Sequence, residues 1–339
     1  RAARGRAGCP AAGHGGRERP GGKSVAPGGR GAAVTVGAVG DRFADLAAAV
    51  GANGIRYTLA WGEGADPQDV DDLLTREPEI RTVLVTHNET STGVTNPMQA
   101  LAEVVKRHGR LLVVDGVSSI GSIDLPVDRW KVDVAITASQ KGWMLPPGVT
   151  MLSVSKEAWQ RQALCRSPRF YFDWERAHTM QMKGMTFTTP AVGILFGLRE
   201  ALQMMREEGL QAIFARHRRI AGAFRAVATA LNLRLLAPEE LASPTVTAIY
   251  FPEALQGEKA DAVLKTWRDL HLVVGEGQAK LAGKIFRIGH LGAVYDPDVV
   301  ATVEALEKGL EMHGHPVTPG AALAAARRIL QSSQPSLVA

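Results

Sequence analysis

The chain has 339 residues, of which 45% are hydrophobic and 22% charged, a composition typical of a globular protein with room for two domains. No apolar run approaches the ~20 residues that cross a bilayer, no signal-peptide core is present, and two cysteines cannot build a disulfide framework, so we expect a cytoplasmic protein without membrane contact. The net charge of +5 comes from residues 1–30, which hold seven Lys or Arg and one Glu, so we expect no nucleic acid as a partner of the folded part.

The first 31 residues form a Gly/Arg/Pro-rich head that differs from the rest of the chain. Thirteen of them are Gly or Pro, and Val25 is the only large aliphatic or aromatic residue. Such a segment buries too little apolar area to offset the entropy lost on ordering it. We expect a disordered basic tail or a stretch read out of frame; a basic arm for nucleic acid is a third reading.

From Ala32 onward, predicted strands and helices alternate. Short runs of Val, Ile, Leu, Ala and Thr predict strands, and apolar residues at helical spacing predict helices. The predicted strands are 32–36, 55–61, 81–86, 111–115, 132–137 and 149–154, and the predicted helices are 41–50, 66–75 and 97–108. This alternation favours an α/β fold with a mostly parallel sheet flanked by helices.

The second half of the chain is helical first and then mixed. The predicted helices are 192–208, 210–231, 259–270 and 297–312, and the predicted strands are 234–236, 246–250 and 285–288. We therefore expect a large domain over 32–209, a smaller α+β C-terminal domain over 210–314, and a tail over 315–339 with one short Ala-rich helix. The basic run Arg216–Arg219 is expected to be a solvent-exposed helix face.

Polar side chains follow three successive strong strands. His87 to Thr90 comes after the strand 81–86, Asp115 ends the next strand, and Gln140 and Lys141 follow the strand 132–137. Right-handed crossovers bring the carboxyl ends of parallel strands to one edge, so one cleft could hold Thr90, Asp115 and Lys141. A partly desolvated lysine at such an edge is suited to trapping a carbonyl group. We predict that Lys141 carries pyridoxal phosphate as a Schiff base.

The neighbouring residues fit the same cofactor. A buried carboxylate beside the pyridine nitrogen keeps that nitrogen protonated, which the cofactor needs as an electron sink, and Asp115 is the candidate. Thr90 could bond the phenolic oxygen, Val117 could pack on the ring, and Gln140 with Ser139 could bind the phosphate. Taken alone, each residue could be an ordinary turn or core residue; the joint arrangement favours the cofactor.

Several motifs, in this order and spacing, resemble the class V aminotransferases, which are pyridoxal-phosphate enzymes of the aspartate aminotransferase fold (fold type I). The matching stretches are Thr86-His-Asn-Glu-Thr-Ser-Thr-Gly-Val94, Val113-Val-Asp-Gly-Val-Ser-Ser-Ile-Gly121, Ala138-Ser-Gln-Lys-Gly142 with Pro146-Pro-Gly148, and Arg287-Ile-Gly-His-Leu-Gly292. The closer likeness is to the alanine–glyoxylate and serine–glyoxylate aminotransferases, and it covers roughly residues 33–314.

The resemblance implies a role for each candidate residue. Lys141 would form the Schiff base and then shuttle a proton between the substrate α-carbon and the cofactor. Asp115 would pair with the pyridine nitrogen, and Arg287 would bind the substrate α-carboxylate. The remaining cofactor contacts would be Thr90 to the phenolic oxygen, Gln140 to the phosphate, Val117 to the ring face, and Thr188, in the segment Gly184–Pro190, to the phosphate of the partner in a homodimer.

The expected function is transfer of an amino group from alanine, serine or aspartate to a 2-oxo acid such as glyoxylate. The family also has a Ser/Gly phosphate loop and a stacking aromatic residue ahead of the first predicted strand, and residues 1–31 match neither. A truncated or frame-disrupted homologue with weak or no catalysis therefore stays open. So does another pyridoxal-phosphate reaction of the lyase or cysteine desulfurase type, although Cys9 and Cys165 lack an obvious setting for it. The nine histidines show no metal-binding spacing, so no metal is expected.

Overall fold

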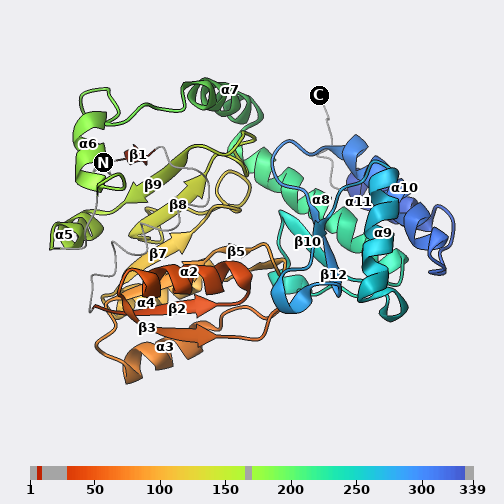
Figure 1. The fold of residues 1–339 in the computed structure, drawn as a ribbon, viewed down its shortest axis with the longest axis horizontal. Helices are drawn as coiled ribbons and strands as arrows, with labels where there is room; N and C mark the ends of the chain where they lie inside the picture. The colour runs from red at the N-terminus through yellow and green to blue at the C-terminus, as the bar shows by residue number, and fades with distance from the viewer. Residues whose placement is uncertain (1–5, 10–28, 165–169, 333–339) are drawn as a thin grey trace.

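The computed structural model describes residues 6–9, 29–164 and 170–332, with only the backbone described for 6–9. The chain forms two lobes, and the larger one is built on a seven-stranded sheet in the order β1-β9-β8-β7-β4-β2-β3 (Figure 1). Its strands are β1 (Arg6–Cys9), β2 (Arg30–Thr35), β3 (Asn53–Thr58), β4 (Thr82–Thr86), β7 (Leu111–Asp115), β8 (Val134–Ala138) and β9 (Thr150–Val154). All neighbouring strands are parallel except that β9 runs opposite to β1 and β8, which confirms the mostly parallel α/β sheet.

Helices cover both faces of this sheet because its central strands are apolar on both sides. Every residue of β4, β7 and β8 is buried. One face forms a core with α3 and α4, and the other forms a core with α2, α5 and α6. The bounds of these helices are α2 (Ala38–Ala49), α3 (Pro67–Arg76), α4 (Met98–Arg107), α5 (Lys156–Leu164) and α6 (Trp174–Gln181). The helix α3 begins as predicted, since the Asp66 side chain accepts a hydrogen bond from the Gln68 N–H and Pro67 is its first residue.

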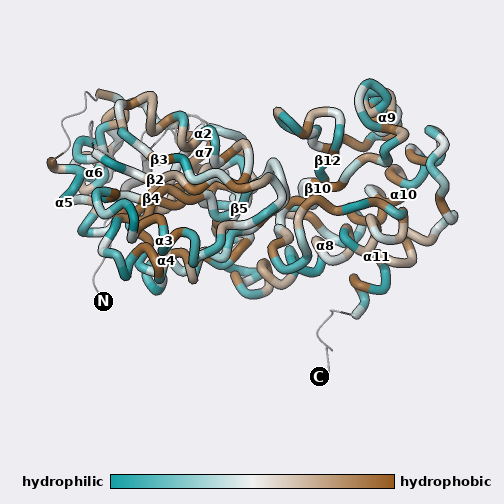
Figure 2. The backbone as a smooth tube through the Cα atoms, turned by 90° about the horizontal axis from the view of Figure 1, so that it is seen from below, coloured by the Kyte–Doolittle hydropathy of each residue, from teal (hydrophilic) through white to brown (hydrophobic). Residues whose placement is uncertain are grey.

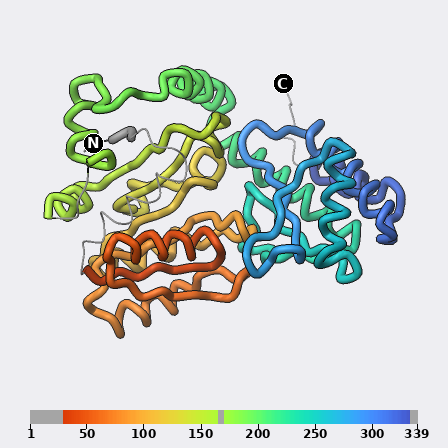
Figure 3. Tube along the Cα trace, in the orientation of Figure 1, coloured from red at the N-terminus to blue at the C-terminus, as the bar shows by residue number. Residues whose placement is uncertain are grey.

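The smaller lobe packs helices on a three-stranded antiparallel sheet in the order β10-β12-β11. Its elements are α8 (Leu210–Ala230), β10 (Val246–Tyr250), α9 (Glu258–Asp269), β11 (Gly275–Glu276), β12 (Ile285–Gly289), α10 (Asp296–Met312), α11 (Ala321–Ser332) and three short 3-10 turns at Glu239–Leu241, Glu253–Leu255 and Ala279–Leu281. The core includes the fully buried rings of Phe224, Trp267 and Phe286. In Figure 2 the hydrophobic colour runs along central strands such as β4 and β10. The helix α7 (Val192–Glu208) connects the lobes, as the continuous trace in Figure 3 shows.

The structure departs from the sequence-based expectations in several segments, and the helices α5 and α6 are not among the predicted ones. Arg6–Cys9 forms the edge strand β1, which needs only backbone hydrogen bonds to β9 and so leaves no trace in composition. The expected strand 234–236 forms only an isolated bridge between Leu235 and Ile249. The helix α11, in the expected tail, places Ala322, Ala326 and Leu330 in the core of the smaller lobe. The domain limits at residues 209 and 314 remain predictions.

A buried polar cluster joins the two lobes at Asn88. This residue begins β5 (Asn88–Glu89), which pairs with β6 (Val94–Thr95) just past the end of β4. The Asn88 amide nitrogen donates to Ser118 Oγ (2.9 Å) and to Thr245 Oγ1 (3.0 Å), and its oxygen accepts from Ser243 Oγ (2.6 Å). One side chain therefore holds the loop after β7 against the segment that leads into β10.

We predict that Asn88→Ala destabilises the protein by about 2–3 kcal/mol, because buried hydroxyl groups of both lobes, those of Ser118, Ser243 and Thr245, each lose one hydrogen bond. Urea unfolding of the wild type and the variant measures this. The matched control is Gln99→Ala on the exposed face of α4, for which a change within about 0.5 kcal/mol is expected. Equal losses for the two variants would contradict the role given to Asn88.

Candidate active site at the carboxyl edge of the sheet

The three predicted strand ends meet at one edge of the sheet. Thr86 at the end of β4 pairs in register with Asp115 at the end of β7, and Asp115 pairs with Ile136 near the end of β8. Asp115 is only 2% exposed, and its Oδ1 accepts a hydrogen bond from the Val117 N–H at 3.0 Å. The carboxylate therefore lies at the centre of the edge and is held by the turn that follows its own strand.

Lys141 lies in a tightly bonded turn after β8, which we call the Lys141 turn (residues 139–146). The Ser139 hydroxyl donates to the Pro146 carbonyl at 2.8 Å, and the Met144 N–H donates to the Lys141 carbonyl at 2.9 Å. A side chain at Gly142 would place its Cβ 2.8 Å from the Ile120 carbonyl, so glycine is required there. Lys141 itself is half-buried, as expected for a lysine at a strand end.

The turn after β5 carries Thr90 and is anchored by a buried carboxylate. Glu89 is fully buried and accepts hydrogen bonds from the backbone N–H groups of Val39 and Gly40, at the start of α2, and from the Ser91 N–H and hydroxyl. Burial raises the pKa of Glu89, and these hydrogen bonds oppose that rise. Because the Glu89 side chain accepts from the first N–H groups of α2 and from Ser91, it fixes α2 against the Thr90 turn.

Arg287 reaches the same edge from the smaller lobe. It lies on β12, and its Nη1 donates to the Thr90 carbonyl at 2.7 Å, while Nε and Nη2 donate to the Glu276 carbonyl at 3.0 and 2.8 Å. Burial lowers the pKa of Arg287, and the charge of Glu89 acts in the opposite direction. Three of its five N–H groups are used within the described part of the chain, which leaves two for a ligand.

The structure brings most of the predicted residues to this edge, but not all of them are linked. Asp115, Val117 and the Lys141 turn follow neighbouring strands, and Arg287 contacts Thr90 directly. Val117 is buried in the core beside Ile136, so its contact with a cofactor ring remains a prediction. Thr188 lies between α6 and α7, and within the described residues its hydroxyl forms no hydrogen bond to the other candidates. The roles of all seven candidates remain predictions.

Polar atoms at this edge fit a polar ligand. Thr86 Oγ1 and Gln140 Oε1 are buried and have no hydrogen-bond partner among the described residues. Buried polar atoms in folded proteins are almost always paired, so these positions suit a ligand that brings its own donors and acceptors. Pyridoxal phosphate, with a phenolic oxygen, a ring nitrogen and a phosphate, is such a ligand.

Sequence reasoning missed several residues of this region. Thr86 and Glu89 were within the quoted motif but received no role, although a buried Glu beside a Ser–Thr turn is a signal for a carboxylate anchor.

The interpretation of Arg216–Arg219 as a solvent-exposed face is wrong for three of the four residues. Arg216 and Arg219 form ion pairs with Glu208 and Asp296, and His217 is fully buried.

Two further expectations concern metals and membranes. Within residues 29–164 and 170–332, no three His, Cys, Asp or Glu residues come together in a way that could hold a metal ion. No helix in the described part of the chain is both long and apolar enough to cross a membrane. Cys165 lies outside the described residues.

Comparison with known proteins agrees with the sequence motifs. A family model described as aminotransferase class-V matches residues 44–291. The chain is 42% identical, over 88% of its length and 78% of the relative's, to a protein of Synechococcus sp. (strain PCC 6716) named "Soluble hydrogenase, small subunit". It is 37% identical to the serine–glyoxylate aminotransferase of Methylorubrum extorquens, over 96% of this chain and 83% of that one. The solved pyridoxamine–pyruvate aminotransferase from Mesorhizobium loti matches with a TM-score of 0.90 and 30% identity, over 97% of this chain and 85% of that one.

We predict that His87, buried just after β4, makes stability fall in acid. Burial lowers the pKa of His87 to about 4, whereas an unfolded histidine titrates near ~6.5. Between these two pH values the histidine takes up a proton only in the unfolded chain, so lowering the pH stabilises the unfolded state relative to the folded state. The free energy of unfolding should therefore decrease from about pH 6.5 to about pH 4, by at most ~1.4 kcal/mol per pH unit for this one group.

Urea unfolding of wild type and His87→Gln at pH 7, 5.5 and 4.5 measures this contribution. The variant should lose less stability on acidification than the wild type, and the difference between them isolates His87 from His217 and His290, whose burial also lowers their pKa values. Parallel curves for the two proteins would show that His87 does not titrate in this way.

Proposed function

Given that the chain belongs to the class-V aminotransferase family of pyridoxal-phosphate-dependent transaminases, we propose that it transfers an amino group from serine, alanine or aspartate to glyoxylate. The observation that carries this proposal is the hydrogen bond of Arg287 to the Thr90 carbonyl. It brings a partly buried cation from the smaller lobe to the strand ends that carry Asp115 and Lys141. An α-amino acid needs this combination: a cation for its carboxylate and an electron-withdrawing cofactor beside its α-carbon.

The cofactor would be held by residues of the carboxyl edge. Lys141 would bond to the cofactor's carbonyl carbon, and Asp115 would pair with the cofactor's pyridine nitrogen. Because the Asp115 carboxylate is buried, it would be a strong partner for a protonated ring nitrogen. Thr90 is assigned to the phenolic oxygen, Gln140 to the phosphate and Val117 to one ring face. The hydroxyl of Thr86, in register with Asp115, is available for a further polar contact.

Each side chain then has a distinct task in the reaction. When bound, pyridoxal phosphate withdraws electrons from the α-carbon of the amino acid, so that carbon releases its proton more readily. We propose that the Lys141 amine moves that proton from the α-carbon to the cofactor's C4′ atom. The hydrogen bonds within the Lys141 turn hold the backbone from which this amine extends, and Asp115 keeps the pyridine nitrogen protonated.

Arg287 is proposed to orient the substrate. Its two remaining N–H groups match a carboxylate, which accepts two parallel hydrogen bonds from a guanidinium. The backbone carbonyls of Thr90 and Glu276 hold the guanidinium in place before the substrate arrives, so less conformational entropy is lost on binding. This recognises the α-carboxylate of any amino acid; the identity of the donor depends on side-chain contacts elsewhere in the cleft.

A homodimer is the assembly that we propose. Large exposed hydrophobic side chains gather in the segment between residues 170 and 210, which includes Phe170 (74% exposed), Met182 (75%) and Phe196 (67%). In Figure 1 the helix α7 lies on the outside of the larger lobe. An apolar surface of this kind usually marks an interface between proteins. The same segment carries Thr188, which fits the expectation that this residue contacts the partner's cofactor.

We predict that the protein with added pyridoxal phosphate forms glycine from glyoxylate when serine, alanine or aspartate is supplied. Lys141→Ala should lower kcat by ~10²–10⁴, because the proton carrier is lost. Arg287→Lys should raise the KM for the amino donor by about 10- to 100-fold, since one charged hydrogen bond of the bidentate pair is lost. Lys259→Ala, on the exposed face of α9, is the control and should keep wild-type rates. Wild-type activity in Lys141→Ala, or no glycine with any donor, would overturn the proposal.

We also predict that the protein is a dimer in solution and that Phe196→Asp shifts it to a monomer, because a carboxylate cannot be buried in the apolar interface without a large cost. Light scattering after size-exclusion chromatography gives the mass directly. Val273→Asp changes another exposed hydrophobic residue, 80% exposed on the smaller lobe, and should leave the dimer intact. A monomeric wild type, or the same shift in both variants, would contradict this assignment.

A further inference from the structure

The backbone of Gly292 lies close to the Lys141 turn. Gly292 comes three residues after the end of β12, the strand that carries Arg287. A Cβ at this position would lie 3.0 Å from Met144 Cγ and 3.8 Å from the Lys141 carbonyl oxygen, and the φ of +85° favours glycine. The loop after β12 therefore approaches the Lys141 turn so closely that a side chain at Gly292 would crowd Met144.

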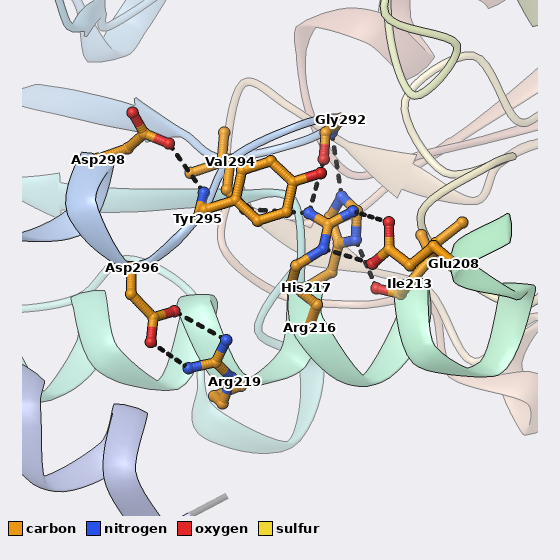
Figure 4. A network of polar contacts seen from close by, with 10 residues as sticks. All are labelled: Glu208, Ile213, Arg216, His217, Arg219, Gly292, Val294, Tyr295, Asp296 and Asp298. Atoms are coloured by element: carbon orange, nitrogen blue, oxygen red, sulfur yellow. Dashed lines mark hydrogen bonds and ion pairs between the residues drawn. The ribbon is translucent and has the colours of Figure 1, made fainter. Parts of the chain in front are cut away.

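Both polar groups of Gly292 are held by α8, as Figure 4 shows. Its N–H donates to His217 Nε2 at 3.0 Å, and its carbonyl accepts from Arg216 Nη1 at 2.8 Å. His217 Nδ1 lies 2.7 Å from the Ile213 carbonyl, which can only accept, so the proton is on Nδ1 and Nε2 is free to accept. Burial lowers the pKa of His217 to about 4, so this neutral form persists near neutral pH.

Arg216 is itself fixed in one orientation. Its guanidinium forms a two-pronged ion pair with Glu208, the last residue of α7, at 2.6 and 2.9 Å. Its Nη1 also donates to the Val294 carbonyl at 3.0 Å, and the Tyr295 ring lies over it at 4.7 Å (Figure 4). One side chain thus ties together the end of α7, the start of α8 and the loop after β12.

Met144 of the Lys141 turn packs against an apolar cluster of Met205, Ile213 and Phe214, which α7 and α8 supply. A cavity of about 400 Å³ adjoins this contact and is lined by Gly142, Met144, His217 and Gly292, among others. Because the cavity leaves part of the turn without packed neighbours, the close approach of Gly292 adds to the support that the apolar cluster gives. A shift of the turn would displace the Lys141 amine relative to Arg287.

We propose that Arg216 and His217 are positioning residues that hold Gly292 against the Lys141 turn and so set where the Lys141 amine lies. The catalytic consequence rests on the proposed role of Lys141, whereas the structural coupling does not. These two side chains act through the backbone of Gly292 and need no contact with substrate. The same loop continues into the strand of Arg287, so the coupling links the substrate-binding strand to the turn that carries the lysine.

Hydrogen exchange of the cofactor-free protein tests the coupling without relying on activity. In His217→Leu the Gly292 N–H loses its acceptor, and the amides of Met144 and Leu145, which close the Lys141 turn, should exchange about tenfold faster. His217→Gln keeps an acceptor near the place of Nε2 and should restore slow exchange. Mass spectrometry of the peptide over 139–146 gives the rates. Unchanged exchange in His217→Leu would overturn the proposal.

The matched control is Arg219→Gln. Arg219 lies on the same helix and forms an ion pair with Asp296, at the start of α10, without contact to Gly292. Loss of this ion pair should leave hydrogen exchange of the peptide 139–146 unchanged. Faster exchange in Arg219→Gln would show that any disturbance of α8 destabilises the Lys141 turn, and it would also overturn the proposal. If His217→Leu fails to fold, Gly292→Ala disturbs the same contact from the other side and should speed exchange of the same peptide.

The effect on catalysis is measured separately, through kcat and KM. With pyridoxal phosphate added, His217→Leu should lower kcat by about 10- to 100-fold while the KM for the amino donor changes less than about twofold, because Arg287 stays bonded to Thr90 and Glu276. Faster exchange without any fall in kcat would mean that the coupling exists but that Lys141 does not have the proposed role. A rise in KM with unchanged kcat would contradict the positioning of the lysine.

Discussion

The burial of the central sheet on both faces is the constraint on which the rest of the molecule depends. The strands β4, β7 and β8 have no solvent-facing side, so most of their side chains are apolar. Polar chemistry is then possible only where these strands end. Because they are parallel and in register, Thr86, Asp115 and the Lys141 turn emerge together at one edge. The candidate site is thus a consequence of how the core is built.

The smaller lobe completes this edge through a few buried polar contacts. Arg287 bonds to the Thr90 carbonyl, and Asn88 joins the loop after β7 to the segment before β10. Both contacts have defined geometry and are at least partly buried, so they hold their partners in one arrangement. Glu89 adds an anchor for α2 beside the Thr90 turn. The site therefore depends on the relation between the lobes as much as on the sheet.

Much of the fold could be predicted because the hydrophobic runs of the strands and the spacing of the helices are local properties of the sequence. The strand ends followed from these runs, and with them Asp115 and Lys141. Arg287 could be assigned only by the family resemblance, since nothing local links β12 to Thr90. His217 was missed because its partner, Gly292, lies far away in the sequence. A cluster of basic residues resembles a solvated face until the structure supplies Glu208 and Asp296. The strand Arg6–Cys9 was missed because backbone pairing has no compositional signal.

We propose that Lys141, and no other lysine of the chain, bonds covalently to pyridoxal phosphate. Borohydride reduction of the protein mixed with the cofactor, followed by digestion and peptide mass spectrometry, identifies the lysine that bonds. We predict a single modified peptide, with the pyridoxyl group on Lys141, which vanishes when an amino donor is added before the borohydride. A modified peptide that contains another lysine, or no modified peptide at saturating cofactor, would contradict the claim.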